Sequence, residues 1–351
     1  MTVRLLPVAV VIPAYNAQRF IEEALESVRA QTAEPAEVIV VDDGSTDRTA
    51  AIARASGATV LAQPNMGVAA ARNTAIRSTV QPWVAFLDAD DVWEPQKLEA
   101  QWAAIQACPD VGAVFTDFIE FNVEGSLGGT FFSRKAHYWA MKRVAVAPGV
   151  LDCDAESLRR QFLEGNFIAP STMLVRRDLL LQIGLFDTTL SHLEDRDCWL
   201  RLLAVSTMAV VERPLMRSRI HESNLTHDKF RMNVAGILLT ERILANPTKY
   251  PPGTAEQYRK ERPLWHLDAG RFAEEDGNLQ RARQYYLQAW RFGGGLLPFA
   301  LAVLSYFPAP VRCVVRAVRH RLHASPRRPD HRGPRGPVDS QGHLSIRGPR
   351  P

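Results

Sequence analysis

Short apolar runs alternate with helix-like segments through the first 120 residues, and this alternation restricts the fold more than any other feature of the sequence. Val8–Ile12 is an apolar, mostly β-branched run between two prolines, and Phe20–Ala30 then carries apolar residues at helical spacing. Apolar strands separated by helices are typical of a parallel sheet that is covered on both faces. We therefore predict a Rossmann-like α/β layer. Strands are expected at 8–12, 38–41, 59–61, 83–87 and 113–116, and helices at 20–30, 47–56, 67–78 and 95–107.

The remaining sequence is less regular and then becomes helical. Residues 120–165 hold several glycines and aromatic residues, which fits either a flap over a site or an insertion packed on the sheet. Further elements are expected as strands at 171–175 and 208–211, and as helices at 177–183, 198–204, 264–276 and 279–292. We predict a catalytic domain at 1–227, a helical accessory region at 228–323 and a disordered tail, rich in proline and arginine, at 324–351.

The apolar stretch Leu296–Val318 has two interpretations. Prolines interrupt it, so it makes no continuous membrane span, and arginines follow it. A helix docked on the catalytic domain is one interpretation. An apolar face lying in a membrane surface is the other, which gives the chain a peripheral membrane contact.

Net charge and cysteine content exclude some classes of protein. The chain carries +4, but Arg319–Pro351 holds eight Arg and two Asp, so this tail contributes +6 and the remainder −2. A basic surface for nucleic acid is therefore not expected on the folded part. The four cysteines lie far apart, which predicts buried free thiols in a reducing cytoplasm and no zinc site. The run Val8–Ile12 is too short for a signal-peptide core.

Asp88, Asp90 and Asp91 directly follow the apolar strand at 83–87. Ligands of open α/β sheets bind at the carboxyl ends of strands, and hard cations such as Mg²⁺ and Mn²⁺ prefer carboxylate oxygens. The cluster therefore fits a metal site that receives substrate phosphates. A solvated loop, or a helix N-terminus that Asp91 caps, remains the alternative.

A second acidic loop, Val41–Asp47, follows the strand at 38–41. Asp43 could accept a hydrogen bond from a nucleotide base, whereas Asp47 could simply cap the next helix. Arg72 lies within the next predicted helix but one, where it could reach a phosphate or a base carbonyl. A surface salt bridge is the alternative for Arg72.

Two later segments also contain candidate functional residues. Glu194 and Asp195 precede an apolar helix face, where they could serve as a general base or could merely favour the helix N-terminus. His221 closes an Arg-Ile-His sequence and could be a metal ligand, although a lone histidine also fits a structural role.

These pieces occur in the order in which they occur in the family 2 glycosyltransferases, and the chain resembles this family over about residues 8–226. The resemblance implies a GT-A fold and an inverting transfer that a divalent metal, Mn²⁺ or Mg²⁺, assists. It also implies a nucleotide-diphosphate sugar as donor, with uracil as the expected base, and a glycan or a lipid-linked acceptor. The motifs that carry it are Val10–Asn16, Val41–Asp47, Asn65–Asn73, Phe86–Trp93 and Glu194-Asp195.

The resemblance also implies a role for each matching residue. Asp195 is the candidate catalytic base, with Glu194 beside it. Pro13, Ala14, Tyr15, Asp43, Arg72 and Asp88 are the candidate nucleotide-binding residues, and Asp90, Asp88 and His221 are the candidate metal ligands.

The sequence differs from the processive members of the family in two ways, which bear on how many sugars are transferred. No Gln-x-x-Arg-Trp motif follows Asp195, and no multi-span membrane region is apparent. We therefore expect transfer of one or a few sugars, in the cytoplasm or at the inner face of the membrane. A nucleotidyltransferase that forms nucleotide sugars and a non-catalytic protein of the same fold are the rival interpretations. The sequence Ala14–Ala17, which lacks a glycine-rich phosphate loop, disfavours the first.

Overall fold

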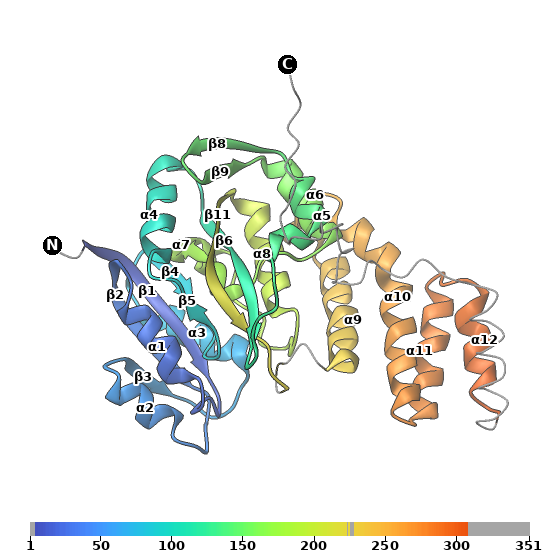
Figure 1. Cartoon of the computed structure of the whole chain (residues 1–351). Helices are drawn as coiled ribbons and strands as arrows, with labels where there is room; N and C mark the ends of the chain where they lie inside the picture. Colours follow the sequence, from blue (N-terminus) through green and yellow to red (C-terminus); the bar gives the residue numbers. More distant parts are fainter. Residues whose placement is uncertain (1–3, 223, 225–227, 308–351) are drawn as a thin grey trace, which may run out of the picture.

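A computed structural model describes residues 4–222, 224 and 228–307. Within these residues the strands form one mixed sheet in the order β3-β2-β1-β4-β10-β6-β11-β9-β8, while β5 and β7 pair with β11 and β6 (Figure 1). The strands are β1 (Arg4–Ala14), β2 (Ala33–Asp42), β3 (Thr59–Ala62), β4 (Trp83–Phe86), β5 (Val92–Trp93), β6 (Ala113–Asn122), β7 (Gly125–Ser126), β8 (Arg143–Ala147), β9 (Val150–Cys153), β10 (Leu174–Arg176) and β11 (Met208–Arg219).

Helices cover both faces of the sheet and continue beyond it. They are α1 (Ile21–Arg29), α2 (Thr49–Ala55), α3 (Val68–Ser78), α4 (Lys97–Ala107), α5 (Ala136–Trp139), α6 (Ala155–Glu164), α7 (Arg177–Gln182), α8 (Glu194–Val205), α9 (Lys229–Ala245), α10 (Thr254–Glu275), α11 (Leu279–Arg291) and α12 (Leu296–Leu304).

The parallel half of the sheet, β3-β2-β1-β4, follows directly from the apolar strand sequences. Successive residues of a strand point to opposite faces. Val10 and Ile12 accordingly pack on the side of α1, α2 and α4, whereas Val11 packs with α3, α7 and α8. Both faces are buried over β4 and over the carboxyl-terminal halves of β1 and β2, and the predicted mostly parallel, two-sided layer is confirmed.

The second half of the sheet departs from the expected boundaries. β6 and β11 run to residues 122 and 219, well beyond the predicted ends at 116 and 211. The register between them shifts around Pro214, which cannot donate a ladder hydrogen bond. Past this shift β11 also pairs with β5, at Met216 with Trp93 and at Arg217 with Val92. The end of β11 is thereby brought to the loop that follows β4.

The region 120–165 is more ordered than predicted. It contains α5, the hairpin β8–β9 and α6, which packs Leu158 and Phe162 into the main core. Two aromatic residues of this region stack on each other: the ring centroids of Phe132 and Tyr138 lie 3.9 Å apart. The insertion is therefore a packed part of the domain.

The predicted strand at 171–175 is wrong in its first half. Residues Pro170–Thr172 form a 3-10 turn, and the strand is β10, which runs antiparallel to β4 and β6. The turn directs the Ser171 hydroxyl to Asp91, so this residue serves the loop after β4 and not the sheet.

Helices α9–α12 extend outward from the catalytic sheet in chain order (Figure 1). Leu239 and Ile243 of α9 and Tyr258 of α10 join the main core, whereas α10, α11 and α12 share a smaller core of their own. α10 starts ten residues before the predicted helix at 264 and accommodates Pro263 inside it. No helix among the described residues is long and apolar enough to cross a membrane.

Several expectations concern residues outside the described part of the chain. The disordered tail at 324–351, the end of the accessory region at 323, the end of the apolar stretch at Val318 and the state of Cys313 all lie there. The other three cysteines, Cys108, Cys153 and Cys198, are buried and free, as predicted. The domain boundary at 227/228 stays a prediction, although α9 begins at Lys229.

Candidate active site

The carboxyl ends of β1, β2 and β4 meet at one edge of the sheet, as parallel pairing requires. The first two loops are joined by hydrogen bonds. Asp43 N donates to Ala14 O at 2.8 Å, and the Asn16 side chain accepts from Thr46 N at 2.8 Å. Asn16 itself has φ 49°, a left-handed conformation that asparagine tolerates better than most residues. Pro13 and Ala14 thus end β1 beside the acidic loop, and the Tyr15 side chain is exposed there.

Asp43 is almost fully buried and organises the start of α3. Its Oδ1 accepts from Gln63 Nε2 at 2.7 Å and from Met66 N at 2.9 Å, and its Oδ2 accepts from Gly67 N at 2.8 Å. Gly44 follows with φ 79°, and a Cβ there would stand 2.9 Å from Asn65 N. A carboxylate oxygen can accept two hydrogen bonds, so Oδ2 retains an acceptor position. Base binding by Asp43 stays a prediction.

Asp47 was expected at most to cap the next helix, but the residue before α2 is Arg48, which has no side-chain cap. Asp47 Oδ1 accepts from Thr49 N at 2.9 Å, and its Oδ2 accepts from Gln18 N at 3.1 Å. The side chain therefore ties the loop before α2 to the loop after β1.

Arg72 joins two motifs that are 122 residues apart. Its Nη2 donates to Asp88 Oδ1 at 2.7 Å and its Nη1 donates to Glu194 Oε1 at 2.8 Å, while the guanidinium lies 5.3 Å from the Phe186 ring centroid. Burial alone would lower the pKa of Arg72, but the two carboxylates outweigh it and raise that pKa. The surface salt bridge considered for Arg72 is wrong, because only 2% of the residue is exposed.

Asp90 and His221 form the second polar pair of the site. His221 Nε2 lies 3.0 Å from Asp90 Oδ2, and the imidazole stacks on Phe20 with the ring centroids 4.8 Å apart. Arg219 fixes this arrangement, since its Nε donates to Asp90 O at 3.0 Å and its guanidinium pairs with Glu23. The end of β11 is therefore fastened to the loop after β4.

Asp91 does not cap the following helix, so that alternative is wrong. Its Oδ2 accepts from the Ser171 hydroxyl at 2.6 Å and its Oδ1 accepts from Arg219 N at 3.1 Å. The residue before α4 is Gln96, without a side-chain cap. Burial, with the charges of Asp90 and Asp88, raises the pKa of Asp91 well above its ordinary value. Asp91 supports the loop, while Asp88 and Asp90 remain partly exposed.

Glu194 and Asp195 open α8 and face the same centre. Burial raises the pKa of Glu194 to about 7, although Arg72 beside it acts to lower it. Burial likewise raises the pKa of Asp195, whose Oδ1 accepts from Arg196 N at 2.7 Å. Asn166 Nδ2 lies 3.4 Å from Asp195 Oδ2. Carboxylates with raised pKa values are typical of general bases.

The predicted metal ligands are brought together only in part. Asp90 and His221 lie side by side, but Asp88 turns toward Arg72. Among the residues that the structure describes, no three His, Cys, Asp or Glu side chains are grouped to hold a metal ion. A divalent cation that binds nucleotide phosphates needs only one or two protein carboxylates. The Asp90–His221 pair therefore fits a cation whose other ligands come from the substrate.

Several residues of the site gave no signal in the sequence. The Ser171 hydroxyl donates to the Asp91 carboxylate and accepts from Asp88 N, and Asn166 contacts Asp195. Gln63 supports Asp43. Each acts across many residues of chain and belongs to no motif, so only the folded structure identifies it.

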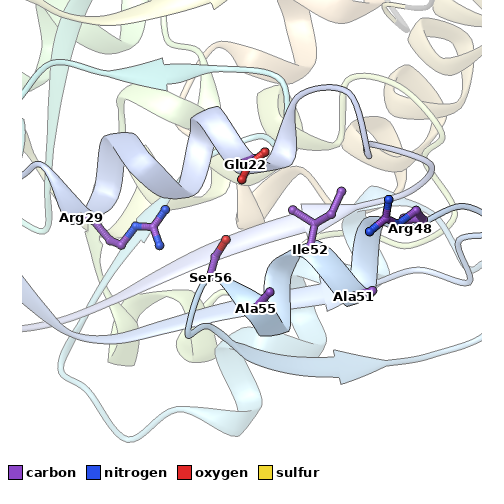
Figure 2. A pocket seen from close by; sticks show the side chains of 7 residues that line it. All are labelled: Glu22, Arg29, Arg48, Ala51, Ile52, Ala55 and Ser56. Atoms are coloured by element: carbon purple, nitrogen blue, oxygen red, sulfur yellow. The ribbon is translucent and has the colours of Figure 1, made fainter.

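A groove of about 380 Å³ between α1 and α2 lies apart from these residues (Figure 2). It sits on the helices that cover the sheet, and none of the residues predicted for the site lines it. The polar cluster at the strand ends is the better candidate, because parallel α/β sheets bind their ligands there. The groove is lined by Glu22, Arg29, Arg48, Ala51, Ile52, Ala55 and Ser56.

Carboxylates at the ends of neighbouring parallel strands, facing a further pair of acids on α8, fit the site of a transferase that uses a nucleotide sugar. Comparison with known proteins agrees. The model of the family described as "Glycosyl transferase family 2" matches residues 9–183. The chain belongs to glycosyl transferase family 2.

Relatives with recorded sequences are similar over the same part of the chain. An uncharacterized glycosyltransferase of Rickettsia prowazekii is 30% identical over 224 residues, which are 63% of this chain and 66% of that protein. Glycosyltransferase GlyG of Streptococcus pneumoniae is 27% identical over 50% of this chain and 58% of its own. The chain thus spans about two thirds of the rickettsial relative's length.

Solved structures share the fold over most of the chain. S. aureus TarS 1-349, in complex with UDP-GlcNAc, has a TM-score of 0.59 at 18% identity and covers 91% of this chain and 93% of its own. The mannosyltransferase PcManGT from Pyrobaculum calidifontis, in complex with GDP-Man and Mn²⁺, has a TM-score of 0.53 at 21% identity, covering 92% and 86%. These likenesses confirm the predicted GT-A fold with C-terminal helices.

The raised pKa of Glu194 predicts how stability depends on pH. In the folded protein Glu194 is the carboxylate partner of Arg72 above about pH 7 and takes up a proton below it, whereas in the unfolded chain it takes up that proton only near the ordinary value of 4.5. The free energy of unfolding should therefore fall as pH rises from 4.5 to about 7, by at most about 1.4 kcal/mol per pH unit from this group. Urea unfolding of wild type and Glu194→Gln across this range measures it, and the variant should show a flatter profile.

Glu156→Gln is the control, because Glu156 is exposed on α6. It should keep the wild-type slope. Equal slopes in all three proteins would contradict the protonated state of Glu194.

Proposed function

We propose that this chain is an inverting glycosyltransferase that moves a sugar from a nucleotide diphosphate, UDP in the first instance, to a hydroxyl group of a glycan or a lipid-linked acceptor. One observation carries the proposal: Arg72 holds Asp88, at the end of β4, against Glu194, beside the candidate base Asp195. This contact supports a site in which the donor loops and the base would lie on either side of one centre. Transfer is proposed to be non-processive.

The donor would bind across the ends of β1, β2 and β4. Pro13, Ala14 and Tyr15 would line the nucleotide pocket, with the exposed Tyr15 ring available to contact the base or ribose. Asp43 would accept from the base through its open acceptor position. UDP is the first choice because the similar TarS structure contains UDP-GlcNAc, and GDP is the second because PcManGT contains GDP-Man.

Asp90, with His221, would hold the metal at the diphosphate. A divalent cation bound there would supply positive charge that offsets the charge growing on the leaving oxygen. Asp88 would stay on Arg72 and orient the ribose side of the donor. Arg219 would keep Asp90 in place through its bond to the Asp90 carbonyl oxygen.

Asp195 would remove the proton from the acceptor hydroxyl as that oxygen attacks the anomeric carbon. Its raised pKa suits a base that must accept a proton near neutral pH. Attack opposite the leaving diphosphate inverts the anomeric centre, so an α-linked donor gives a β-linked product. Glu194 would stay bonded to Arg72. The positive charge of Arg72 would offset the repulsion between Glu194 and Asp88.

The donor site predicts metal-dependent nucleotide binding. One of UDP, GDP, dTDP and CMP should raise the melting temperature in the presence of Mn²⁺ and lose that effect in Asp90→Ala. A ligand at 100 times its Kd stabilises the folded state by about 2.7 kcal/mol, which a thermal shift assay detects. Asp110→Ala, an exposed turn substitution, should behave as wild type.

If no nucleotide stabilises the wild-type protein, donor binding is refuted and the non-catalytic interpretation replaces it. Release of pyrophosphate from a nucleoside triphosphate and a sugar phosphate would instead identify a nucleotidyltransferase.

The base assignment predicts a loss of turnover without a loss of donor binding. Asp195→Asn should lower kcat by roughly 100-fold or more, because general-base catalysis contributes about that much, while the Kd of the donor stays near wild type. Turnover of the matching nucleotide sugar and a binding titration measure the two quantities. Near-normal kcat in Asp195→Asn would remove Asp195 from the role, and Asp110→Asn serves as the matched control.

We also propose that the protein works in the cytoplasm and that α12 binds an anionic membrane surface, where a lipid-linked acceptor would lie. One face of α12, at Pro298, Leu301 and Ala302, packs into the accessory core. The opposite face leaves Leu296 80% exposed and Tyr306, just after the helix, 74% exposed. Phe299 and Val303 are also exposed, so the apolar stripe covers positions 296, 299, 303 and 306 at helical spacing.

The sequence around this stripe has the charge that anionic lipid attracts. Residues 277–351 contain thirteen Arg, no Lys and two Asp, a net charge of +11 in a chain whose total is +4. The preceding 276 residues therefore carry −7. An exposed apolar stripe within a basic segment is typical of a surface-bound helix on anionic lipid.

This surface predicts selective adsorption to anionic vesicles. The wild-type protein should float with vesicles that contain phosphatidylglycerol, bind pure phosphatidylcholine less, and release as salt rises, because salt screens the charge. The double variant Phe299→Asp and Val303→Asp should lose most of the bound fraction. Val123→Asp, at an exposed turn of the catalytic domain, should bind as wild type. Equal flotation of the double variant would overturn the assignment of this face.

A further inference from the structure

The first turn of α8 carries the candidate base but lacks the usual means of holding a helix start. The helix has no side-chain cap, and the residue before it, Leu193, has φ 61° in the left-handed region. The first backbone N–H groups of a helix have no partner within the helix. A left-handed leucine persists only where surrounding contacts fix it. Some other part of the chain must therefore hold this turn.

Two tyrosines of the accessory region supply that hold. Arg196 Nε donates to the Tyr258 hydroxyl at 2.8 Å, and the Tyr250 hydroxyl donates to Asp197 Oδ1 at 2.7 Å. Arg196 also donates through Nη2 to Leu163 O at 2.8 Å. Tyr250 and Tyr258 are both buried, so these hydroxyl bonds are shielded from water. They come from the segment before α10 and from α10 itself.

These contacts lead directly to the base. Successive residues of a helix point about 100° apart, so Glu194 reaches Arg72 on one side while Arg196 and Asp197 reach the tyrosines on another. The Asp195 carboxylate is oriented by the backbone N–H of Arg196, at 2.7 Å from Oδ1. The amide that orients the base thus belongs to the residue whose side chain Tyr258 holds.

We propose that Tyr250 and Tyr258 are positioning residues that fix the first turn of α8 and thereby aim the Asp195 carboxylate at the acceptor. The proposal rests on the proposed function, because it takes Asp195 as the base. Both tyrosines lie outside residues 9–183, the segment that the family model matches. The helical region is accordingly a working part of the catalytic centre and not only an appendage of it.

The test compares tyrosine-to-phenylalanine variants by two readouts. Tyr258→Phe and Tyr250→Phe each remove one hydroxyl that bonds to α8, and the double variant removes both. Tyr286→Phe is the matched control, since Tyr286 is a buried tyrosine of the same region whose hydroxyl donates to Glu274 at 2.8 Å, with no bond to α8. Amide hydrogen exchange of the peptide covering 193–199 and steady-state kinetics with the donor are measured on the full-length protein.

We expect exchange in this peptide to become at least about tenfold faster in Tyr258→Phe and in the double variant, and to stay at the wild-type rate in Tyr286→Phe. In the same variants kcat should fall about tenfold or more while the donor KM changes less than about twofold, because the donor loops are untouched. Unchanged exchange, or an equal effect of Tyr286→Phe on kcat, would overturn the proposal.

Two further outcomes separate this proposal from the proposed function. Faster exchange of the 193–199 peptide together with a wild-type kcat would show that the tyrosines hold α8 but do not orient Asp195. That result also overturns the proposal. If the wild-type protein transfers no sugar from any donor, the proposed function fails, and the exchange readout alone decides whether the tyrosines hold α8.

Discussion

A buried guanidinium between two carboxylates is the interaction on which the arrangement of the site depends. Arg72 is held inside the protein by α3, and it draws Asp88 from the sheet and Glu194 from α8 to the same point. A buried charge without partners is strongly unfavourable, and removing one partner of such a set leaves the others unpaired. The burial of Arg72 therefore holds the loop after β4 close to α8, the helix that carries Asp195.

The placement of the acidic motifs could be predicted from the sequence, because it follows from local patterns. A buried strand that ends in Asp42 or Phe86 must deliver the next residues to the edge of a parallel sheet, whatever the rest of the chain does. The partners of those residues could not be predicted. Arg72 was expected near a phosphate or a base, yet one of its two carboxylate partners, Glu194, lies on a helix 122 residues later. Contacts at that separation depend on tertiary packing that no local pattern records.

The position of His221 illustrates the same limit in a different way. Its approach to Asp90 requires β11 to shift register around Pro214 and then to pair with β5. The proline is visible in the sequence, but the direction in which the strand bends depends on β6, β5 and the Arg219 contacts. The Ser171 hydroxyl is similar, because its partner Asp91 lies 80 residues away. Side chains that support a site are therefore harder to predict than those that form it.

The site is assembled from two parts that differ in how they are supported. The candidate donor residues from Pro13 to Asp90 lie at the ends of parallel strands, in the loops that follow them or on α3, within the segment that the family model matches. Asp195 stands outside that segment, on a helix start without a cap, next to the accessory helices. Family membership therefore supports the donor chemistry more directly than the geometry of the base. Because the proposed base would meet the acceptor, the two accessory tyrosines that bond to α8, Tyr250 and Tyr258, lie next to the part of this chain in which acceptor selectivity would be determined.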